Sequence, residues 1–338
     1  MFMRYIFFGT SEFAAIIISR LIATGMAPLA VVTQPDRPAG RGKKLQESPM
    51  KLVVKKHNIP LLQPEKIKDY RLQITELKPD FCIIAAYGEI IPKEILKIPK
   101  YGFLNVHPSF LPKYRGPSPI QSSILNGDTE TGLTIILLDE QVDHGPIIAN
   151  DELGIMNYVT APQLEQKLAM IGAELLVKTI PAWVAGKITP VPQDHVKATF
   201  TKMITKEDGH IEWKKSAEEI ERHVRAMAPW PGSWTIWEHE KKEIRIHLRK
   251  VLVHQGSSRL GSNSMTLPYP LLRRFGRSGL RGESFVAGKV LAITKNAMIV
   301  ACAKDALAIH TLQPEGKKEM TAHAFVNGHR SIIGSVLE

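Results

Sequence analysis

Continuous apolar runs that alternate with helical patterns are the feature that most constrains the fold of this chain. They occur at Tyr5–Phe8, Leu29–Val32, Phe81–Ala86 and Leu133–Leu138. Strands that are buried on both faces of a parallel sheet have this composition, because neither face meets water. After the first run, apolar residues recur at helical spacing as far as Leu21, with Ser11 in the N-cap position. The pattern therefore predicts an N-terminal α/β domain with a mainly parallel sheet.

A long helix and a polar segment close this first domain. Residues 161–185 place their apolar side chains on one helical stripe. The residues that follow mix Pro, Gln, Asp and Lys, which is typical of a connection. We therefore predict a first domain over residues 1–186, a linker over 187–206 and a second domain over 207–338.

The second domain has the pattern of a small antiparallel β-barrel. A short charged helix at residues 216–227 precedes several short strand-like runs. In residues 244–249 apolar and basic residues alternate, which places Arg245, His247 and Arg249 on the outer face. The predicted strands are Trp234–Trp237, Ile244–Val253, Val290–Ile293, Met298–Ala301 and Leu307–Leu312.

Residues 255–284 interrupt this domain with a different composition. They are rich in Ser, Gly, Arg and Leu, and they contain five Arg against one Glu. Such a segment buries too little apolar surface to fold alone, so we predict a disordered insertion. A functional role for its positive charge is the alternative.

Charge and cysteine content narrow the class of protein. A net charge of +11 indicates an anionic partner, most often nucleic acid, although a merely basic protein is the alternative. Two Cys in 338 residues do not make a disulfide scaffold, so we expect a reducing compartment, the cytoplasm. No apolar run approaches the ~20 residues of a membrane span. No Cys or His cluster has metal-ligand spacing, and Gly9-Thr10-Ser11 is not a dinucleotide fingerprint. We therefore expect neither a membrane contact nor a metal.

Residues 104–119 give the strongest indication of chemistry. Asn105 and His107 are two apart at the end of an apolar run, so both point to one face if the run is a strand. Asp143 follows the run that ends at Leu138, and we expect all three at the carboxyl ends of strands, where α/β sheets bind ligands. An amide donor, an imidazole that titrates near neutral pH and a carboxylate are the parts that acyl transfer requires. Taken singly, they could instead be a turn cap, a core His and a turn residue.

These residues resemble those of a known family. Asn105, His107, Asp143 and the loop 109–116 (Ser-Phe-Leu-Pro-Lys-Tyr-Arg-Gly) resemble the signature of the folate-dependent formyltransferases. The resemblance covers nearly the whole chain and implies a Rossmann-like formyltransferase domain followed by an OB-like barrel. In such an enzyme the amine attacks the formyl carbon and a tetrahedral oxyanion forms. Asn105 and His107 would stabilise that charge, and Asp143 would hold His107 in place. The group that removes the amine proton stays open.

The resemblance also implies where the co-substrate, 10-formyltetrahydrofolate, would bind. The turn 86–92 would offer backbone groups to the pterin, and the loop 109–112 would lie along the folate. Phe110 stands where the family usually has Leu, an apolar exchange that we expect to preserve the pocket wall. The residues implied are Tyr87, Gly88, Ile90, Ser109, Phe110, Leu111 and Pro112.

A basic segment resembles the tRNA-facing loop of those family members that act on tRNA. Residues 34–51 carry five Lys or Arg against two acidic residues, with Pro and Gly among them, so we predict a flexible loop. Basic groups on such a loop suit contacts with RNA phosphates. The implied acceptor is the amino group of initiator methionyl-tRNA, and we expect a monomer. The residues expected at the tRNA are Arg37, Arg41, Lys43, Lys44, Arg245 and Arg249.

Two other functions stay open on the sequence. A related enzyme could formylate a small amine, such as a nucleotide sugar or a purine precursor, but a small acceptor needs no basic segment at 34–51. Alternatively, the chain could be a tRNA-binding protein with a vestigial catalytic site. The intact Asn105, His107 and Asp143 argue against that alternative.

Overall fold

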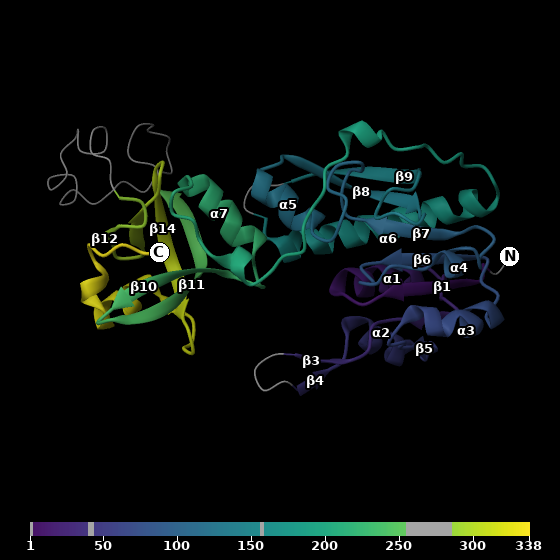
Figure 1. Cartoon of the computed structure of the whole chain (residues 1–338), viewed down its shortest axis with the longest axis horizontal. Helices are drawn as coiled ribbons and strands as arrows, with labels where there is room; N and C mark the ends of the chain where they lie inside the picture. The colour runs from purple at the N-terminus through teal and green to yellow at the C-terminus, as the bar shows by residue number, and fades with distance from the viewer. Residues whose placement is uncertain (1–2, 40–43, 156–158, 255–285) are drawn as a thin grey trace. The chain divides into compact units, whose positions relative to one another are not determined.

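A seven-stranded sheet forms the centre of the first of two units (Figure 1). Its strand order is β5-β2-β1-β6-β7-β8-β9. The first five strands are parallel, and β8 runs antiparallel to its two neighbours, β7 and β9. The predicted mainly parallel sheet is therefore confirmed. The strands are β1 Tyr5–Gly9, β2 Ala30–Val32, β5 Leu61–Leu62, β6 Phe81–Ala85, β7 Phe103–His107, β8 Glu130–Leu137 and β9 Ile147–Gly154. This computed structural model describes residues 3–39, 44–155, 159–254 and 286–338.

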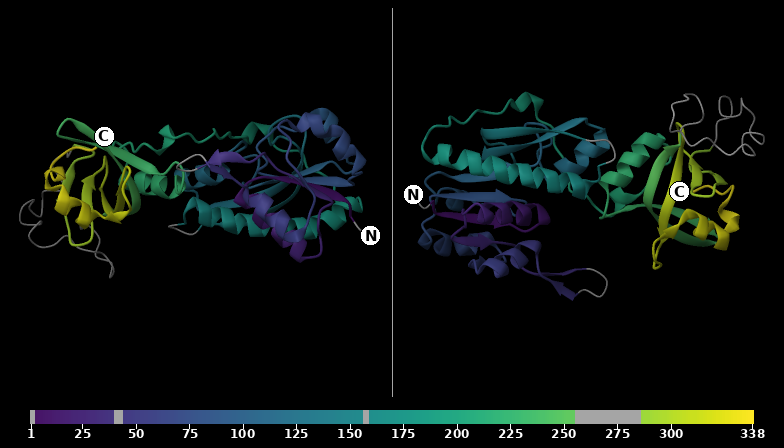
Figure 2. Two further views of the ribbon diagram at one scale, coloured as in Figure 1. Left: turned by 90° about the horizontal axis from the view of Figure 1, so that it is seen from below. Right: turned by 180° about the vertical axis from the view of Figure 1, so that it is seen from behind.

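Both faces of the sheet are covered, as its continuous apolar strands require. On one face Ile6, Phe8 and Phe103 share a core cluster with residues of η1, α3 and α4. Phe7 and Ile83 are equally buried and point the other way, toward α1 and the long helix α6, which pack together (Figure 2). The helices are α1 Glu12–Ala23, α2 Pro49–His57, η1 Ile67–Tyr70, α3 Arg71–Glu76, α4 Lys93–Leu96, α5 Pro119–Asn126 and α6 Ala161–Val184.

The strand order reverses at β1. This strand pairs with β2 on one side and with β6 on the other, and the chain visits them in opposite directions from the starting strand. In open α/β sheets a ligand crevice lies outside the carboxyl ends of the strands at such a reversal. The carboxyl ends that meet here are Gly9, Val32 and Ala85.

Residues 34–51, which we predicted to be a loop, contain a short hairpin and the start of a helix. β3 (Arg37–Ala39) pairs with antiparallel β4 (Lys44–Gln46), and Ser48 caps α2 by accepting a hydrogen bond from Lys51 N at 3.2 Å. The loop prediction is wrong for residues 37–39, 44–46 and 49–51, while residues 40–43 lie outside the described residues. Pro38 is compatible with this strand because a two-stranded hairpin leaves an outer edge without a pairing partner.

The second unit comprises Ile204–Glu338 with Ile124–Gly127 and centres on an antiparallel sheet that curls into a half-barrel. The alternation in β11 is confirmed, because Ile246 and Leu248 are buried while Arg245 and Arg249 are partly exposed. The elements are η2 His195–Lys197 in the first unit, and in the second η3 Glu207–Gly209, α7 Ala217–Ala226, β10 Ser233–His239, β11 Lys242–His254, β12 Val290–Ile293, β13 Met298–Ala301, β14 Ala306–Pro314, β15 Met320–Thr321, α9 Ala322–Gly328 and η4 Arg330–Ile332.

The first unit extends further along the chain than the predicted first domain. It comprises Met1–Ser123 and Asp128–Met203, so residues 187–203 of the expected linker belong to it. Hydrogen bonding is the physical reason: Val191 exchanges two backbone hydrogen bonds with Ile147, each of 2.8 Å. Polar composition marks a segment without a buried face, but it does not reveal such pairing.

Three further expectations concern the insertion, a membrane span and a metal site. The predicted insertion at 255–284 lies outside the described residues. Among the helices that are described, none is both long and apolar enough to cross a bilayer. In the same part of the chain, no group of three or more His, Cys, Asp or Glu side chains could hold a metal ion.

Candidate active site

The carboxylate of Asp143 brings together the side chains that the sequence singled out. Its Oδ1 accepts a hydrogen bond from Asn105 Nδ2 at 3.0 Å, and its Oδ2 accepts one from the Gly116 backbone N–H at 2.7 Å. The same Oδ2 lies 3.5 Å from Nδ1 of His107. Asn105 and His107 both lie on β7, two residues apart, and both reach this carboxylate. An amide, an imidazole and a carboxylate are thus assembled in one place.

His107 is held from two sides. Its Nε2 lies 2.9 Å from the carbonyl oxygen of Tyr114, which can only accept, so Nε2 carries a proton. Its Nδ1 faces Asp143, and the ring is only 4% exposed. An imidazole confined in this way keeps a single orientation, as a group that stabilises charge or moves a proton must.

Asn105 is the member of this group that solvent reaches. It is partly exposed, whereas His107 and Asp143 are buried. Its Nδ2 carries two hydrogens, and the hydrogen bond to Asp143 uses one of them. Within the described part of the chain nothing accepts the second N–H, which is therefore available to an oxygen atom of a substrate.

Asp143 reaches this position by a loop that folds back over β7. β8 runs antiparallel to β7, with Leu137 opposite Leu104, so its carboxyl end does not share an edge with His107. Asp143 has φ 49°, a left-handed conformation that Asp tolerates better than most residues. We predicted all three residues at the carboxyl ends of strands that meet at one edge of the sheet. This is right for Asn105 and His107 and wrong for Asp143, because an apolar run does not reveal strand direction.

The loop that follows β7 is anchored from within the sheet. Thr134 lies opposite His107 and is buried. Its Oγ1 donates to Ser109 O at 2.7 Å and accepts from Leu111 N at 3.1 Å. Ser109 and Leu111 are themselves buried, so they support the loop, while Phe110 between them is 42% exposed.

A segment predicted to be a linker completes the site, and we call residues 191–203 the strap. Arg115 N donates to Thr199 O at 2.8 Å, and Thr201 N donates to Arg115 O at 2.7 Å. Tyr114 N donates to Thr199 Oγ1 at 2.8 Å, so the strap is bonded on both sides of the carbonyl that binds His107. Sequence analysis missed the strap because a single extended segment has no amphipathic period.

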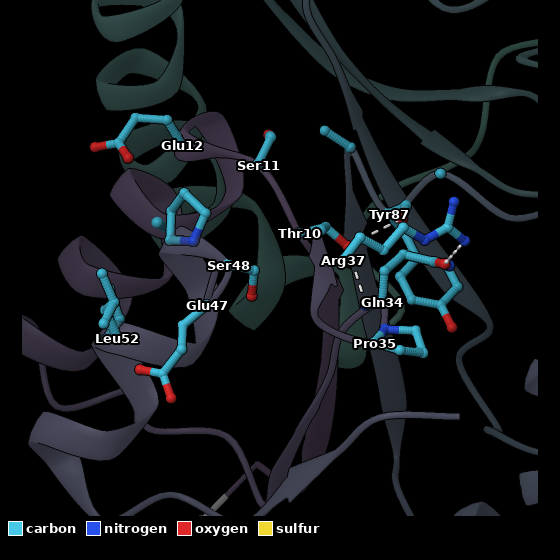
Figure 3. A pocket seen from close by; sticks show the side chains of 15 residues that line it. Thr10, Ser11, Glu12, Gln34, Pro35, Arg37, Glu47, Ser48, Leu52 and Tyr87 are labelled. Carbon is cyan, nitrogen blue, oxygen red and sulfur yellow. Dashed lines mark hydrogen bonds between the residues drawn. The ribbon is translucent and has the colours of Figure 1, made fainter. Parts of the chain in front are cut away.

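A cavity of about 950 Å³ opens where the strand order reverses (Figure 3). Thr10 Oγ1 donates to Tyr87 O at 3.1 Å across its wall, and Arg37 Nη2 donates to Gln34 Oε1 at 3.4 Å. It does not contain the Asp143 cluster. Ala86, Tyr87 and Gly88 line it directly after β6, the strand that pairs with β7 and places Ile84 opposite Asn105. The lining residues are Thr10, Ser11, Glu12, Ala15, Gln34, Pro35, Arg37, Glu47, Ser48, Pro49, Leu52, Val53, Ala86, Tyr87 and Gly88.

The residues predicted at the folate divide into three groups. Tyr87 and Gly88 line the cavity, and burial raises the pKa of the Tyr87 phenol, which therefore stays neutral. Ile90 is 73% exposed, and Phe110 is the exposed tip of its loop. Exposed apolar side chains next to backbone polar groups suit a flat heterocycle with polar edges. Phe110 is supported by its loop neighbours Ser109, Leu111 and Pro112.

The residues predicted at tRNA are described only in part. Arg37 is exposed, Arg41 and Lys43 lie outside the described residues, and for Lys44 only the backbone is described. Arg245 lies over the ring of Trp234, with its guanidinium carbon 4.4 Å from the ring centre. Arg249 Nη2 donates to Gln313 Oε1 at 2.5 Å.

His247 lies between Arg245 and Arg249 along β11. Burial lowers its pKa, with a further contribution from the two arginines. Together with Trp234 on the neighbouring strand β10, this outer face of β11 therefore combines two cations, a neutral imidazole and an indole, a composition that suits RNA phosphates and bases.

Comparison with known proteins gives matches in both units. The family model described as "Formyl transferase" matches residues 3–180, and "Formyl transferase, C-terminal domain" matches residues 203–330. A methionyl-tRNA formyltransferase of Chloroflexus aurantiacus (strain ATCC 29366 / DSM 635 / J-10-fl) is 40% identical over 328 residues, 96% of this chain and 97% of that protein. One from Thermodesulfovibrio yellowstonii is 40% identical over 327 residues, 96% of each chain.

Solved structures share the fold at low sequence identity. HypX from Aquifex aeolicus, in complex with tetrahydrofolic acid, aligns with a TM-score of 0.61 at 16% identity over 98% of this chain. The chain spans about half of HypX, 48% of its length. An N-formyltransferase from Helicobacter canadensis, in complex with folinic acid and dTDP-3-aminofucose, aligns with a TM-score of 0.60 at 17% identity, over 92% of this chain and 99% of that one.

The two family models and the full-length identity point to the same group of enzymes. The matches to the models leave little of the chain outside them, and the 40% identity extends across both units. This chain belongs to the formyl transferase family and, within it, to the methionyl-tRNA formyltransferases.

Proposed function

We propose that this chain transfers a formyl group from 10-formyltetrahydrofolate to the amino group of initiator methionyl-tRNA, in the cytoplasm, for translation initiation. The observation that carries the proposal is the 40% identity to methionyl-tRNA formyltransferases over 96% of the chain. The cluster of Asn105, His107 and Asp143 supports it chemically, because it supplies a free amide donor and a fixed imidazole.

Each member of the cluster has a distinct role in the proposed reaction. The free N–H of Asn105 donates to the formyl oxygen, whose negative charge grows as the amine attacks. His107 stabilises the same charge, and it assists proton transfer to the leaving nitrogen when its Nε2–H exchanges the carbonyl oxygen of Tyr114 for the substrate. Asp143 holds both side chains in place through its two oxygen atoms. The co-substrate supplies the formyl group when bound.

Two surfaces would hold the substrates. We assign the folate to the turn 86–92 and the loop 109–112, where Ile90 and Phe110 expose apolar surface beside backbone polar groups. The tRNA would contact the basic hairpin that begins at Arg37 and the outer face of β11. The net charge of +11 favours a polyanionic acceptor.

A turnover assay with three acceptors tests this function. The purified protein and 10-formyltetrahydrofolate are incubated with charged initiator tRNA, with charged elongator tRNA or with a dTDP-linked amino sugar. We expect rapid formylation of initiator methionyl-tRNA and slow or no formylation of the other two. Preferred formylation of the amino sugar would instead assign the chain a small-amine substrate, of the kind bound in the complex of the Helicobacter canadensis protein with dTDP-3-aminofucose.

A parallel binding measurement addresses the vestigial alternative. If charged tRNA binds tightly but no formyl product accumulates with any acceptor, the chain is a tRNA-binding protein and the proposed function is wrong.

A further inference from the structure

Gln193 of the strap joins the two loops that surround the Asp143 cluster. We infer that Gln193 is a positioning residue for formyl transfer, whose carboxamide fixes the Asp143 carboxylate against Asn105 and His107. The inference rests on the proposed function, because the geometry matters for turnover only if the cluster performs the reaction.

The side chain of Gln193 is fully engaged within the protein. Its Nε2 donates to the carbonyl oxygen of Asp143 at 2.9 Å and to that of Gly145 at 2.7 Å. Its Oε1 accepts from Arg115 Nε at 3.2 Å and from Nη2 at 2.7 Å. A carboxamide has two N–H groups and two lone pairs, so these four bonds use its whole capacity. With 5% exposure, water does not replace any of them.

Both ends of the Gln193 carboxamide, the nitrogen and the oxygen, bind segments that contact the Asp143 carboxylate. One end holds the backbone of Asp143 itself. The other holds Arg115, whose neighbours in the chain are the two residues that touch the cluster. Tyr114 O accepts from His107 Nε2, and Gly116 N donates to Asp143 Oδ2. One side chain therefore sets the distance between the loop that carries the carboxylate and the loop that contacts it.

The loop 143–145 needs an external constraint. Asp143 is in the left-handed region, which costs free energy for a residue with a side chain. At Gly145 the backbone is so close to Leu137 that a Cβ would lie 1.8 Å from its carbonyl oxygen. A tight turn with buried carbonyl groups persists only where donors satisfy them, and Nε2 of Gln193 satisfies two.

The chemistry of the site explains why an amide stands here and not an acid. Arg115 is 3% exposed, and besides Gln193 its Nη2 meets Nδ1 of His195 at 2.8 Å. A Glu at position 193 would pair with Arg115 but would place a carboxylate oxygen against the carbonyl groups of Asp143 and Gly145. Only the amide serves an arginine on one side and two carbonyl groups on the other.

A double-mutant cycle tests the inference. We compare wild type, Gln193→Met, Asp143→Asn and the double variant, because Met keeps the length of the side chain and removes its hydrogen bonds. We expect Gln193→Met to lower kcat by roughly 10- to 100-fold, the scale of a displacement of about 1 Å at a catalytic group, and to leave both KM values within about threefold. In the Asp143→Asn background we expect a further change of less than about twofold, because the effect passes through Asp143.

Two matched variants separate positioning from general destabilisation. Ile180→Ala removes a fully buried side chain near the end of α6. Three residues later, Trp183 Nε1 donates a hydrogen bond to the carbonyl oxygen of Tyr101, which precedes β7. The Ile180→Ala variant should lower the unfolding temperature and leave kcat per folded molecule unchanged. Gln193→Glu should lose activity as Gln193→Met does, and it keeps the inference testable if the Met variant does not fold. Equal losses from Gln193→Met in both backgrounds, or unchanged kcat, would overturn the inference.

Hydrogen exchange provides a readout that does not need turnover. The Gly116 N–H is bonded to Asp143 Oδ2, so its exchange in Gln193→Met should rise at least about tenfold while exchange in β1 stays unchanged. If wild type formylates no acceptor but this exchange rises, the proposed function fails and the positioning stands. If wild type is active and the exchange does not change, the positioning is wrong and the function stands.

Discussion

Among the residues of the site, Asn105 both bonds to the protein framework and can bind a substrate. One N–H of its amide belongs to Asp143, and the other is free for a substrate. His107 and Asp143, by contrast, are enclosed by protein atoms. The roles of these three residues are therefore not equivalent, and the loss of Asn105 bears most directly on the charge that develops during the reaction.

We predict that Asn105→Ala lowers kcat by about 10² or more, the usual scale for the loss of one donor to a developing oxyanion. The KM for the folate should change little, because the exposed folate residues lie on other segments. Steady-state kinetics measure both constants. Asn150→Ala is the matched control, an exposed Asn on β9, and should behave as wild type. Near-normal turnover of Asn105→Ala would remove this residue from the site.

At the scale of elements, the start of α7 depends on a reciprocal cap. Ser216 Oγ accepts from Glu219 N at 3.3 Å, and the Glu219 carboxylate accepts from Ser216 N at 2.8 Å. We predict that Ser216→Ala costs about 1 kcal/mol of folding free energy, as is usual for an N-cap. Urea unfolding followed by circular dichroism measures this cost. Ser331→Ala, at an exposed Ser, should cost much less, and equal costs would contradict the cap.

The outer face of β11 allows a test of RNA contact. Replacing Arg245 and Arg249 by Gln keeps most of each apolar stem and removes two charges. If each touches a phosphate, the slope of log affinity for charged tRNA against log salt becomes shallower by about 0.7 to 0.9 per contact. The double variant Lys304→Ala and Arg330→Ala removes the same charge from exposed positions and should change the slope less. Identical slopes for both pairs would assign the effect to net charge alone.

The elements that the sequence predicts well are those whose signal is local. β6 and α6 are found within a residue or two, because a continuous apolar run and a helical stripe mark their whole length. β9 was missed since its residues are largely exposed or half-buried and show no clear alternation. The prediction that Asn105 and His107 point to one face of the strand follows from their spacing of two. The contact of Gln193 with Arg115 spans 78 positions and leaves no pattern in either segment.

On the scale of the whole molecule, the two units should respond differently to acid. Burial lowers the pKa of His223, His247 and His254, all of which lie in the second unit. A His with a folded pKa below its unfolded value binds protons more readily when unfolded, so stability falls as the pH falls. The loss begins as the pH drops below the ordinary His pKa of about 6.5 and ends below the lowered value.

In the first unit Glu165 works in the opposite sense. Burial raises its pKa above the ordinary 4.5, so the folded unit binds the proton more readily and gains stability as the pH falls through the raised value. We therefore predict that a shift from pH 7.5 to 5.5 lowers the protection factors of backbone amides, that is, their exchange relative to the intrinsic rate at each pH, more in the sheet of the second unit than in that of the first. His223→Gln should weaken this pH dependence, because an amide can still meet Asp208 O and does not titrate. Equal acid sensitivity of both sheets would contradict the prediction.

The position of the strap late in the first unit has a consequence for biosynthesis. During translation Asn105, His107 and Asp143 are synthesised well before residues 191–203. A nascent chain stalled at residue 186 thus holds all three side chains, yet it lacks Gln193 and Thr199, whose hydrogen bonds fix their loops. Domains fold as units as they emerge. Activity should therefore appear only when the strap has left the exit tunnel, so that incomplete translation products stay inert toward folate and tRNA.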